Sequence, residues 1–304
     1  MPNRREPVFA SPSRHSATGV NSRLPSAYAE PIHRVAFGTF LALTLPVWAA
    51  TLLQPRLPGA WCWLDGAYIA LAAITVLTCL ARRLPWQNVA ALGLVIFLTS
   101  GMMLAVAVKT GFPLGRLNFS TDFGPRLLGF VAWPMPFLWV AVLLASWQCA
   151  KVILRPWRRL KGYGWVLLGV SVGLAVLQTL ALEPLGHRVK GWWSWTPVER
   201  PLSWYGAPPG LLIGTPLLIA ALLLLATPWL LPKRPTGQAP PFEPVLVWLA
   251  LEGWFALGDL RAGFRLPGGI ALVAIVAVGV LAWRGRQFTA PSATASDVEP
   301  ASAA

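Results

Sequence analysis

Residues 89–108 read VAALGLVIFLTSGMMLAVAV, twenty consecutive positions without a charged side chain. A helix needs about 20 mostly apolar residues to cross the hydrocarbon core of a bilayer. This run is therefore long enough to span a membrane by itself. Because lipid offers the backbone no hydrogen-bond partners, the run is expected to be helical there.

Seven further apolar runs extend the same pattern along the chain. They cover residues 35–53, 61–81, 127–150, 165–182, 211–231, 244–258 and 266–283. The sequence therefore predicts an all-α fold, a polytopic integral membrane bundle of about eight transmembrane helices. The run at 244–258 is short and contains Glu252, so a re-entrant segment with seven crossings in all is the alternative.

The composition agrees with a membrane domain flanked by two polar tails. Apolar residues make up 56% of the chain and charged residues 12%, against roughly 45–50% and about 25% in soluble domains. Residues 1–34 and 287–304 are polar and rich in Ser, Pro or Ala, which predicts disordered tails on either side of a membrane domain at 35–286.

The net charge of +14 reflects basic residues in short loops, which the positive-inside rule explains better than nucleic-acid binding. With eight crossings, sixteen of the 25 Lys and Arg residues fall on the side of the two tails. This bias predicts that both termini are cytoplasmic, in a bacterial-type inner membrane. The patch at 155–161 is also expected to touch anionic lipid headgroups.

Two connections on the opposite side differ from ordinary short loops. Residues 109–126 and 183–210 are both rich in Gly, Pro and aromatic side chains. Irregular backbone near bilayer depth must be covered by protein or line a cavity, because its polar groups need partners. We expect these two connections to converge on one site at that face of the membrane.

Acidic residues are scarce, and three of the eleven are candidates for chemistry. Glu252 lies within an apolar run, where a carboxyl group is costly and often functional; a protonated or hydrogen-bonded structural residue is the alternative. Glu183 ends the fifth run, where an interfacial helix end is the alternative. Asp122 precedes Phe-Gly-Pro, a context that is also typical of a turn residue.

Aromatic side chains crowd the second connection, which contains Trp192, Trp193, Trp195, Trp204 and Tyr205. An interfacial belt explains most of the other tryptophans of the chain. This density exceeds what a belt requires. Aromatic faces stabilise cations by up to about 2 kcal/mol when desolvated, so the cluster fits a dry pocket for a carbocation, with interfacial anchoring as the alternative.

The sequence predicts neither a metal nor an organic cofactor. Of the three histidines only His187 lies in a candidate connection, because His15 is in the tail and His33 is beside the membrane. One histidine cannot form the multi-histidine site of a membrane di-iron oxygenase. The chain also contains no paired Asp-rich motif for magnesium pyrophosphate and no phosphate-binding loop.

Several short segments follow one another at and around these connections. They are TGFPLGRLNF at 110–119, FGPRLLG at 123–129, Trp139 in the next apolar run, Glu183-Pro184, WSW at 193–195 and WYGAP at 204–208. In this order they resemble the segments of the membrane carotenoid-biosynthesis proteins that include carotenoid 1',2'-hydratases and bisanhydrobacterioruberin hydratase. The resemblance covers roughly residues 85–235.

The chain departs from the family pattern at several polar positions. The family's Tyr-x-Tyr is Leu117-Asn118-Phe119 here, and its Asp before Pro is Glu183. An acidic residue expected before the TG motif is absent at 102–104, and the family's Asn-Phe-x-Gly-Trp is LLIGT at 211–215. These losses are compatible with an enzyme for another substrate or with a member that has lost activity.

The resemblance implies a cofactor-independent hydratase that adds water to the terminal double bond of an acyclic carotenoid. A carboxylic acid would protonate the alkene, and water would capture the tertiary cation. The acid must be neutral before it reacts, which an apolar setting favours. Glu183 is the first candidate for this acid, Asp122 the second and Glu252 the third. A C40 polyene is about as long as the hydrocarbon core is thick, roughly 30 Å, which places its end group at an interface.

The remaining candidate residues would hold the substrate. They are Trp193, Trp195 and Tyr205, which would shield the cation, together with Trp204, Asn118, Phe119, Trp139 and His187. The expected partners are a long apolar carotenoid or other isoprenoid, membrane lipid, and other carotenoid enzymes. A transporter, a lipid-binding protein and an assembly partner without catalytic activity are the alternatives.

Overall fold

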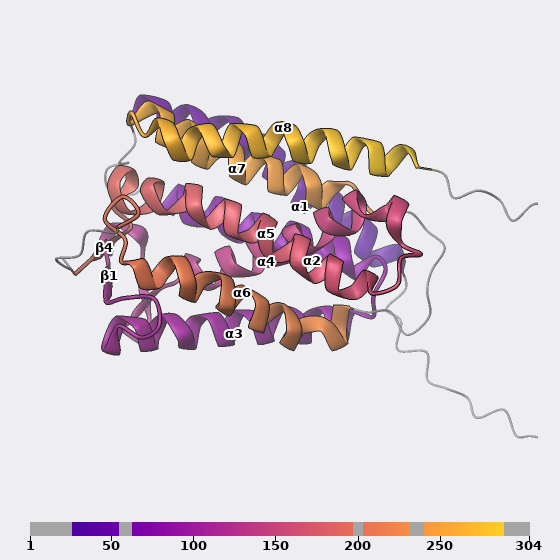
Figure 1. The fold of residues 1–304 in the computed structure, drawn as a ribbon, viewed down its shortest axis with the longest axis horizontal. Coiled ribbons are helices and arrows are strands. Elements are labelled where there is room, and N and C mark those ends of the chain that lie inside the picture. The colour runs from indigo at the N-terminus through magenta and orange to yellow at the C-terminus, as the bar shows by residue number, and fades with distance from the viewer. Residues whose placement is uncertain (1–25, 55–62, 197–202, 231–239, 289–304) are drawn as a thin grey trace, which may run out of the picture.

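The computed structural model describes residues 26–54, 63–196, 203–230 and 240–288, which form a bundle of eight long helices (Figure 1). The helices are α1 (Ser26–Leu53), α2 (Trp63–Ala81), α3 (Trp86–Thr110), α4 (Pro134–Ile153), α5 (Tyr163–Pro184), α6 (Pro209–Leu230), α7 (Glu243–Arg261) and α8 (Arg265–Gln287). Seven of them are long and apolar enough to cross a membrane. The chain is an integral membrane protein, as predicted.

Helix α7 is less apolar and is not among these seven. It nevertheless runs across the full thickness of the bundle. At its first residue, Glu243 accepts a hydrogen bond of 2.8 Å from Arg82 at the end of α2. In its last turn, Arg261 donates to the carbonyl of Leu52 at the end of α1. Since Arg82 also pairs with Glu30 near the start of α1, α7 runs parallel to α1 from one end of the bundle to the other, which favours eight crossings over a re-entrant segment.

Two helix boundaries differ from the predicted runs by more than four residues. Helix α1 begins at Ser26 rather than 35, so part of the predicted tail is helical; ion pairs from Glu30 to Arg34 and Arg82 support this extra length. Helix α4 begins at Pro134 rather than 127, because strands β2 (Arg126–Leu127) and β3 (Val131–Ala132) pair in a small antiparallel hairpin before it. Most of the predicted tails at 1–34 and 287–304, namely residues 1–25 and 289–304, lies outside the described residues.

Helix α4 forms the centre of the bundle. Almost all of its side chains are buried, and it packs against α2, α3, α5, α7 and α8. A helix that is apolar on every face is expected at such a central position. The outer helices instead leave apolar side chains exposed, such as Leu98 and Met102 of α3 and Leu217 of α6, where lipid would cover them.

The candidate connections lie at one end of this bundle. Strands β1 (Leu117–Phe119) and β4 (Trp193–Trp195) stand at the end opposite the C-terminus of α8 (Figure 1). At the other end, Arg155 after α4 donates a hydrogen bond of 3.0 Å to the carbonyl of Arg286 near the end of α8. Arg286 also lies over the ring of Phe242, next to Glu243, and Arg82 pairs with both Glu243 and Glu30 near the start of α1. The start of α1 and the end of α8 therefore share a side, which agrees with an even number of crossings.

Candidate functional site

The two connections expected to converge are joined by a short antiparallel ladder. Strand β1 from the first pairs with strand β4 from the second, and Asn118 lies opposite Ser194 at its centre. The backbone of Ser120 also donates to the carbonyl of Trp192, and that of Thr196 to the carbonyl of Arg116. Segments that are some 75 positions apart in the chain are thereby held together.

The ladder directs two indoles toward one carboxyl group. Side chains alternate across a strand, so Trp193 and Trp195 are buried on one face while Ser194 is exposed on the other. Trp193 Nε1 donates to Glu183 Oε1 at 3.0 Å, and Trp195 Nε1 donates to the same oxygen. The WSW motif is therefore a pair of N–H donors for one buried acid.

A tight turn brings Glu183 and the two indoles together. After α5 the chain continues as a π-helical turn, η4 (Leu185–Lys190), and Gly191 then adopts a left-handed conformation with φ of 67°. A Cβ atom at Gly186 would overlap the ring of Trp193. Glycine at this position therefore lets the Trp193 indole pack directly against the backbone of η4.

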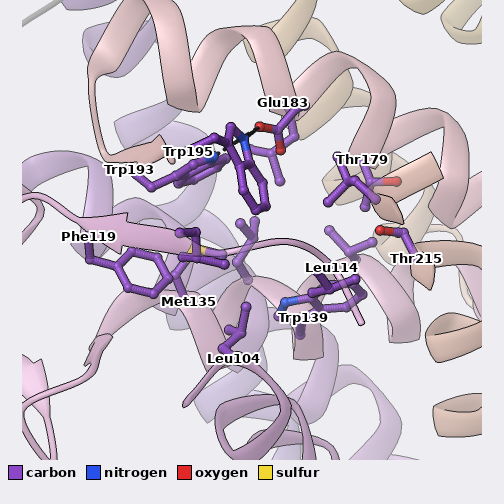
Figure 2. A pocket seen from close by; sticks show the side chains of 15 residues that line it. Leu104, Leu114, Phe119, Met135, Trp139, Thr179, Glu183, Trp193, Trp195 and Thr215 are labelled. Carbon is purple, nitrogen blue, oxygen red and sulfur yellow. Dashed lines mark hydrogen bonds between the residues drawn. The ribbon is translucent and has the colours of Figure 1, made fainter. Parts of the chain in front are cut away.

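Glu183 lines a narrow cavity between α3, α4, α5 and α6 (Figure 2). The centre of a water-sized molecule can occupy about 50 Å³ of it. The lining is mostly apolar and aromatic, and its polar side-chain groups besides the indoles are the Glu183 carboxyl and the hydroxyls of Thr179 and Thr215. Glu183 itself is only 6% exposed.

The structure places five of the predicted site residues around this cavity. They are Glu183, Trp193, Trp195, Phe119 and Trp139. Figure 2 shows them approaching from α5, β4, β1 and α4, so no single segment of the chain contains the site.

Four other predicted binding residues do not line the cavity. Asn118 is exposed on the far face of β1, because its neighbours in the strand point inward. His187 donates from Nδ1 to the carbonyl of Trp193 at 3.1 Å. Trp204 donates to the carbonyl of Leu180 and packs edge-on against Tyr205. These three aromatic side chains brace the connection rather than line the cavity.

Two of the three candidate acids lie outside the cavity. Asp122 is exposed in a 3₁₀ turn, where its backbone N–H donates to the hydroxyl of Ser120, so the structure favours its alternative interpretation as a turn residue. Glu252 is fully buried on α7 but does not line the cavity. Only Glu183 has both burial and access to the cavity.

A buried ion pair beside the site was not anticipated from the sequence. Lys190 Nζ, at the end of η4, lies 3.0 Å from Asp65 Oδ2 at the start of α2, and both side chains are buried. The Lys190 ammonium also lies 5.5 Å from the ring of Trp254. No spacing pattern links positions 65 and 190, because the contact exists only once α2 packs near the turn. Thr215 was likewise missed, since a single Thr in an apolar run carries no signal of its own.

Among the described residues, no group of three or more His, Cys, Asp or Glu side chains is arranged to hold a metal ion. The polar groups that meet at the cavity are one carboxyl, two indole N–H groups and two hydroxyls. Such a set suits acid–base chemistry on an apolar molecule.

Comparison with known proteins identifies a family and no nearer relative. The model of the family described as carotenoid biosynthesis protein matches residues 64–281. This stretch contains both connections, the WSW motif and the helices around the cavity. No curated protein and no solved structure matches the chain.

Proposed function

This chain belongs to the carotenoid biosynthesis protein family, and from that membership we propose that it is a hydratase acting on the end of an acyclic carotenoid. Its role lies in carotenoid biosynthesis, and the reaction is the part that we infer. The observation that carries the inference is a single buried carboxyl group, Glu183, held by two indole N–H groups at the wall of an apolar cavity.

The hydrogen bonds of Glu183 define which of its oxygens gives up a proton. Both indoles donate to Oε1, so in the neutral acid Oε1 is the carbonyl oxygen and the proton is on Oε2. An ionised carboxylate without partners would be costly in this apolar setting. The two N–H donors offset part of that cost once the proton has left, because hydrogen bonds to charged groups contribute about 1.5–3 kcal/mol.

In the proposed reaction Glu183 protonates the less substituted carbon of a terminal double bond. The carboxyl O–H bond breaks, the alkene π pair forms the new C–H bond, and positive charge develops on the tertiary carbon. Water supplies the C–O bond and returns a proton to the carboxylate, so the acid is regenerated and no cofactor is consumed. The faces of Trp195 and Phe119 at the cavity wall would stabilise the cation.

The size, lining and position of the site support a small apolar group at the end of a long substrate. The cavity is small and mostly apolar, and strands β1 and β4, which contribute to its wall, stand at one end of a bundle built to cross the bilayer (Figure 1). An isoprenoid end group fits such a space better than a charged molecule does. The rest of the polyene would lie along the apolar helices, with its far end toward the opposite leaflet.

The test is to express the chain in cells that accumulate an acyclic carotenoid such as lycopene and to analyse the pigments by liquid chromatography and mass spectrometry. We expect a more polar pigment heavier by one water that is absent with the empty vector. Unchanged pigments, with the protein shown to be in the membrane, would refute hydration of that carotenoid and favour a binding or assembly role.

A further inference from the structure

Thr215 presents a buried hydroxyl group that has no hydrogen-bond partner among the described residues. Its side chain on α6 is 5% exposed, and its Oγ1 is unpaired. Threonines in helices commonly donate to a backbone carbonyl one turn earlier. Thr227 of the same helix does so, to the carbonyl of Leu223 at 2.7 Å. Thr215 therefore differs from an ordinary helical threonine.

The unpaired hydroxyl lies in the wall of the cavity that Glu183 lines. Figure 2 shows Thr215 on the opposite side of this space from Trp193 and Trp195, beside Thr179 of α5. Thr179 also lines the cavity, but its hydroxyl is already used in a bond of 2.9 Å to the carbonyl of Val176. Thr215 is thus a donor and acceptor in the cavity wall that no described residue uses.

The packing of α6 holds this hydroxyl in place. Gly210 and Gly214 are in the turns just before Thr215, and Cβ atoms added there would meet the carbonyl oxygen of Pro113 at 3.0 and 3.4 Å. The start of α6 therefore packs closely against the first connection. Thr215 of α6 and Phe119 of β1, in that connection, both line the cavity.

We propose that Thr215 Oγ1 binds the water molecule that captures the cation, which makes it the site for the second substrate. This inference rests on the proposed hydration. A buried water needs about 10–15 Å³ of space open to its centre and two to four polar partners. The cavity has about 50 Å³, and Thr215, Thr179 and Glu183 provide polar atoms.

In this arrangement the Thr215 hydroxyl accepts a hydrogen bond from the water. This bond orients a lone pair of the water oxygen toward the tertiary carbon. The water oxygen forms the C–O bond, and its surplus proton passes to the Glu183 carboxylate. Thr215 neither gains nor loses a proton overall. It is therefore a group that positions water after the cation has formed, whereas Glu183 forms the cation.

Deuterium separates these two roles. In D₂O, purified protein given an acyclic carotenoid in detergent or liposomes adds a deuteron from Glu183 to the alkene. A cation that is not captured loses a proton and returns as deuterated carotenoid. We expect Thr215→Val to lower the hydrated product about tenfold or more, as loss of one hydrogen bond in the transition state predicts, while deuterium continues to enter the recovered substrate.

Two matched variants test the chemistry of the hydroxyl. Thr215→Ser keeps it and should restore the ratio of hydrated product to deuterated substrate. Thr227→Val removes a hydroxyl that is bonded within the same helix and lies outside the cavity, and it should leave that ratio as in the unmodified protein, whatever the total rate. If Thr215→Val does not yield monodisperse protein in detergent, Thr215→Ala takes its place in the same comparison with Thr215→Ser.

The outcomes distinguish this inference from the function on which it rests. If the unmodified protein hydrates the carotenoid and Thr215→Val does so equally well, Thr215 does not bind the water, while the hydratase stands. If hydration and deuteration fall together, Thr215 acts before capture and the inference is overturned. If the unmodified protein produces neither hydrated nor deuterated pigment, the proposed function itself fails.

Discussion

The buried carboxyl group at the end of α5 and those on α7 have different surroundings. Glu183, at the end of α5, receives two indole hydrogen bonds and faces a cavity. Glu252 and Asp259 on α7 are both fully buried, and their carboxyl oxygens have no hydrogen-bond partner among the described residues. They also do not line the cavity. Burial alone therefore does not make a reactive acid, because a reactive acid also needs donors for its charged form and space for a substrate.

The same contrast separates Glu183 from the nearby Asp65. Asp65 is equally buried, but Lys190 compensates its charge at 3.0 Å. A carboxylate locked in an ion pair is a poor proton donor. The Asp65–Lys190 ion pair instead joins α2 to the turn that follows Glu183. We expect it to hold that turn, and with it the site, in position.

The largest expected effect concerns the acid itself. Glu183→Gln keeps an oxygen that can accept from the indoles but removes the acidic proton, so we expect hydration to fall by about 10²–10⁴-fold, the usual contribution of general acid catalysis. Glu252→Gln makes the same change at a carboxyl outside the cavity and serves as the control. Pigment analysis measures the hydrated product of both variants. An equal loss of hydration in the two would contradict the assignment of Glu183 as the acid.

The ion pair should show the next largest effect, and it should appear in stability. Lys190→Met leaves Asp65 buried without its partner, which typically costs about 3–5 kcal/mol. The double variant Asp65→Leu, Lys190→Met removes both charges and should recover much of that loss. Thermal unfolding in detergent measures the difference, and a double variant as unstable as the single one would show that the pair does not act as a unit.

A smaller effect is expected where the turn passes the indole. A methyl group at Gly186 would overlap the Trp193 ring, and overpacking of this kind costs about 1–3 kcal/mol. Gly186→Ala should therefore lower the unfolding temperature and, by moving Trp193, reduce hydration. Gly173→Ala, in the same stretch of helix but with open space around it, is the control and should be stable. Equal behaviour of the two variants would contradict the close packing seen here.

The smallest effect is expected from the α7 carboxyls. Because an unpaired charge is too costly at such a position, we expect both groups to be neutral acids, and an amide of the same shape is then a mild change. Asp259→Asn should alter the free energy of unfolding by less than about 1 kcal/mol. A large loss of stability would contradict the neutral state. Thermal unfolding of the unmodified protein at several sodium concentrations would then show whether these carboxyls are charged and hold a cation.

Much of the membrane architecture was accessible from the sequence, because a helix that crosses lipid is recognisable from its own residues. The run at 89–108 contains the length and the apolarity that the bilayer demands, and α3 covers it at Trp86–Thr110. Glu183 and the WSW motif were also identifiable, since a carboxyl and clustered indoles are rare next to apolar runs. The start of α4 was placed too early because the apolar residues at 127–133 form a hairpin rather than a helix.

The arrangement of the site depended on contacts between distant segments. Composition alone could not separate Glu183 from Asp122 and Glu252, because all three are acids near or within apolar runs. The pairing of β1 with β4, the π-helical turn at η4 and the approach of α6 decided which carboxyl meets the indoles and which threonine lines the cavity with an unpaired hydroxyl. Apolar runs are a local property that the bilayer reads directly, whereas the surroundings of one carboxyl are created only when the helices pack.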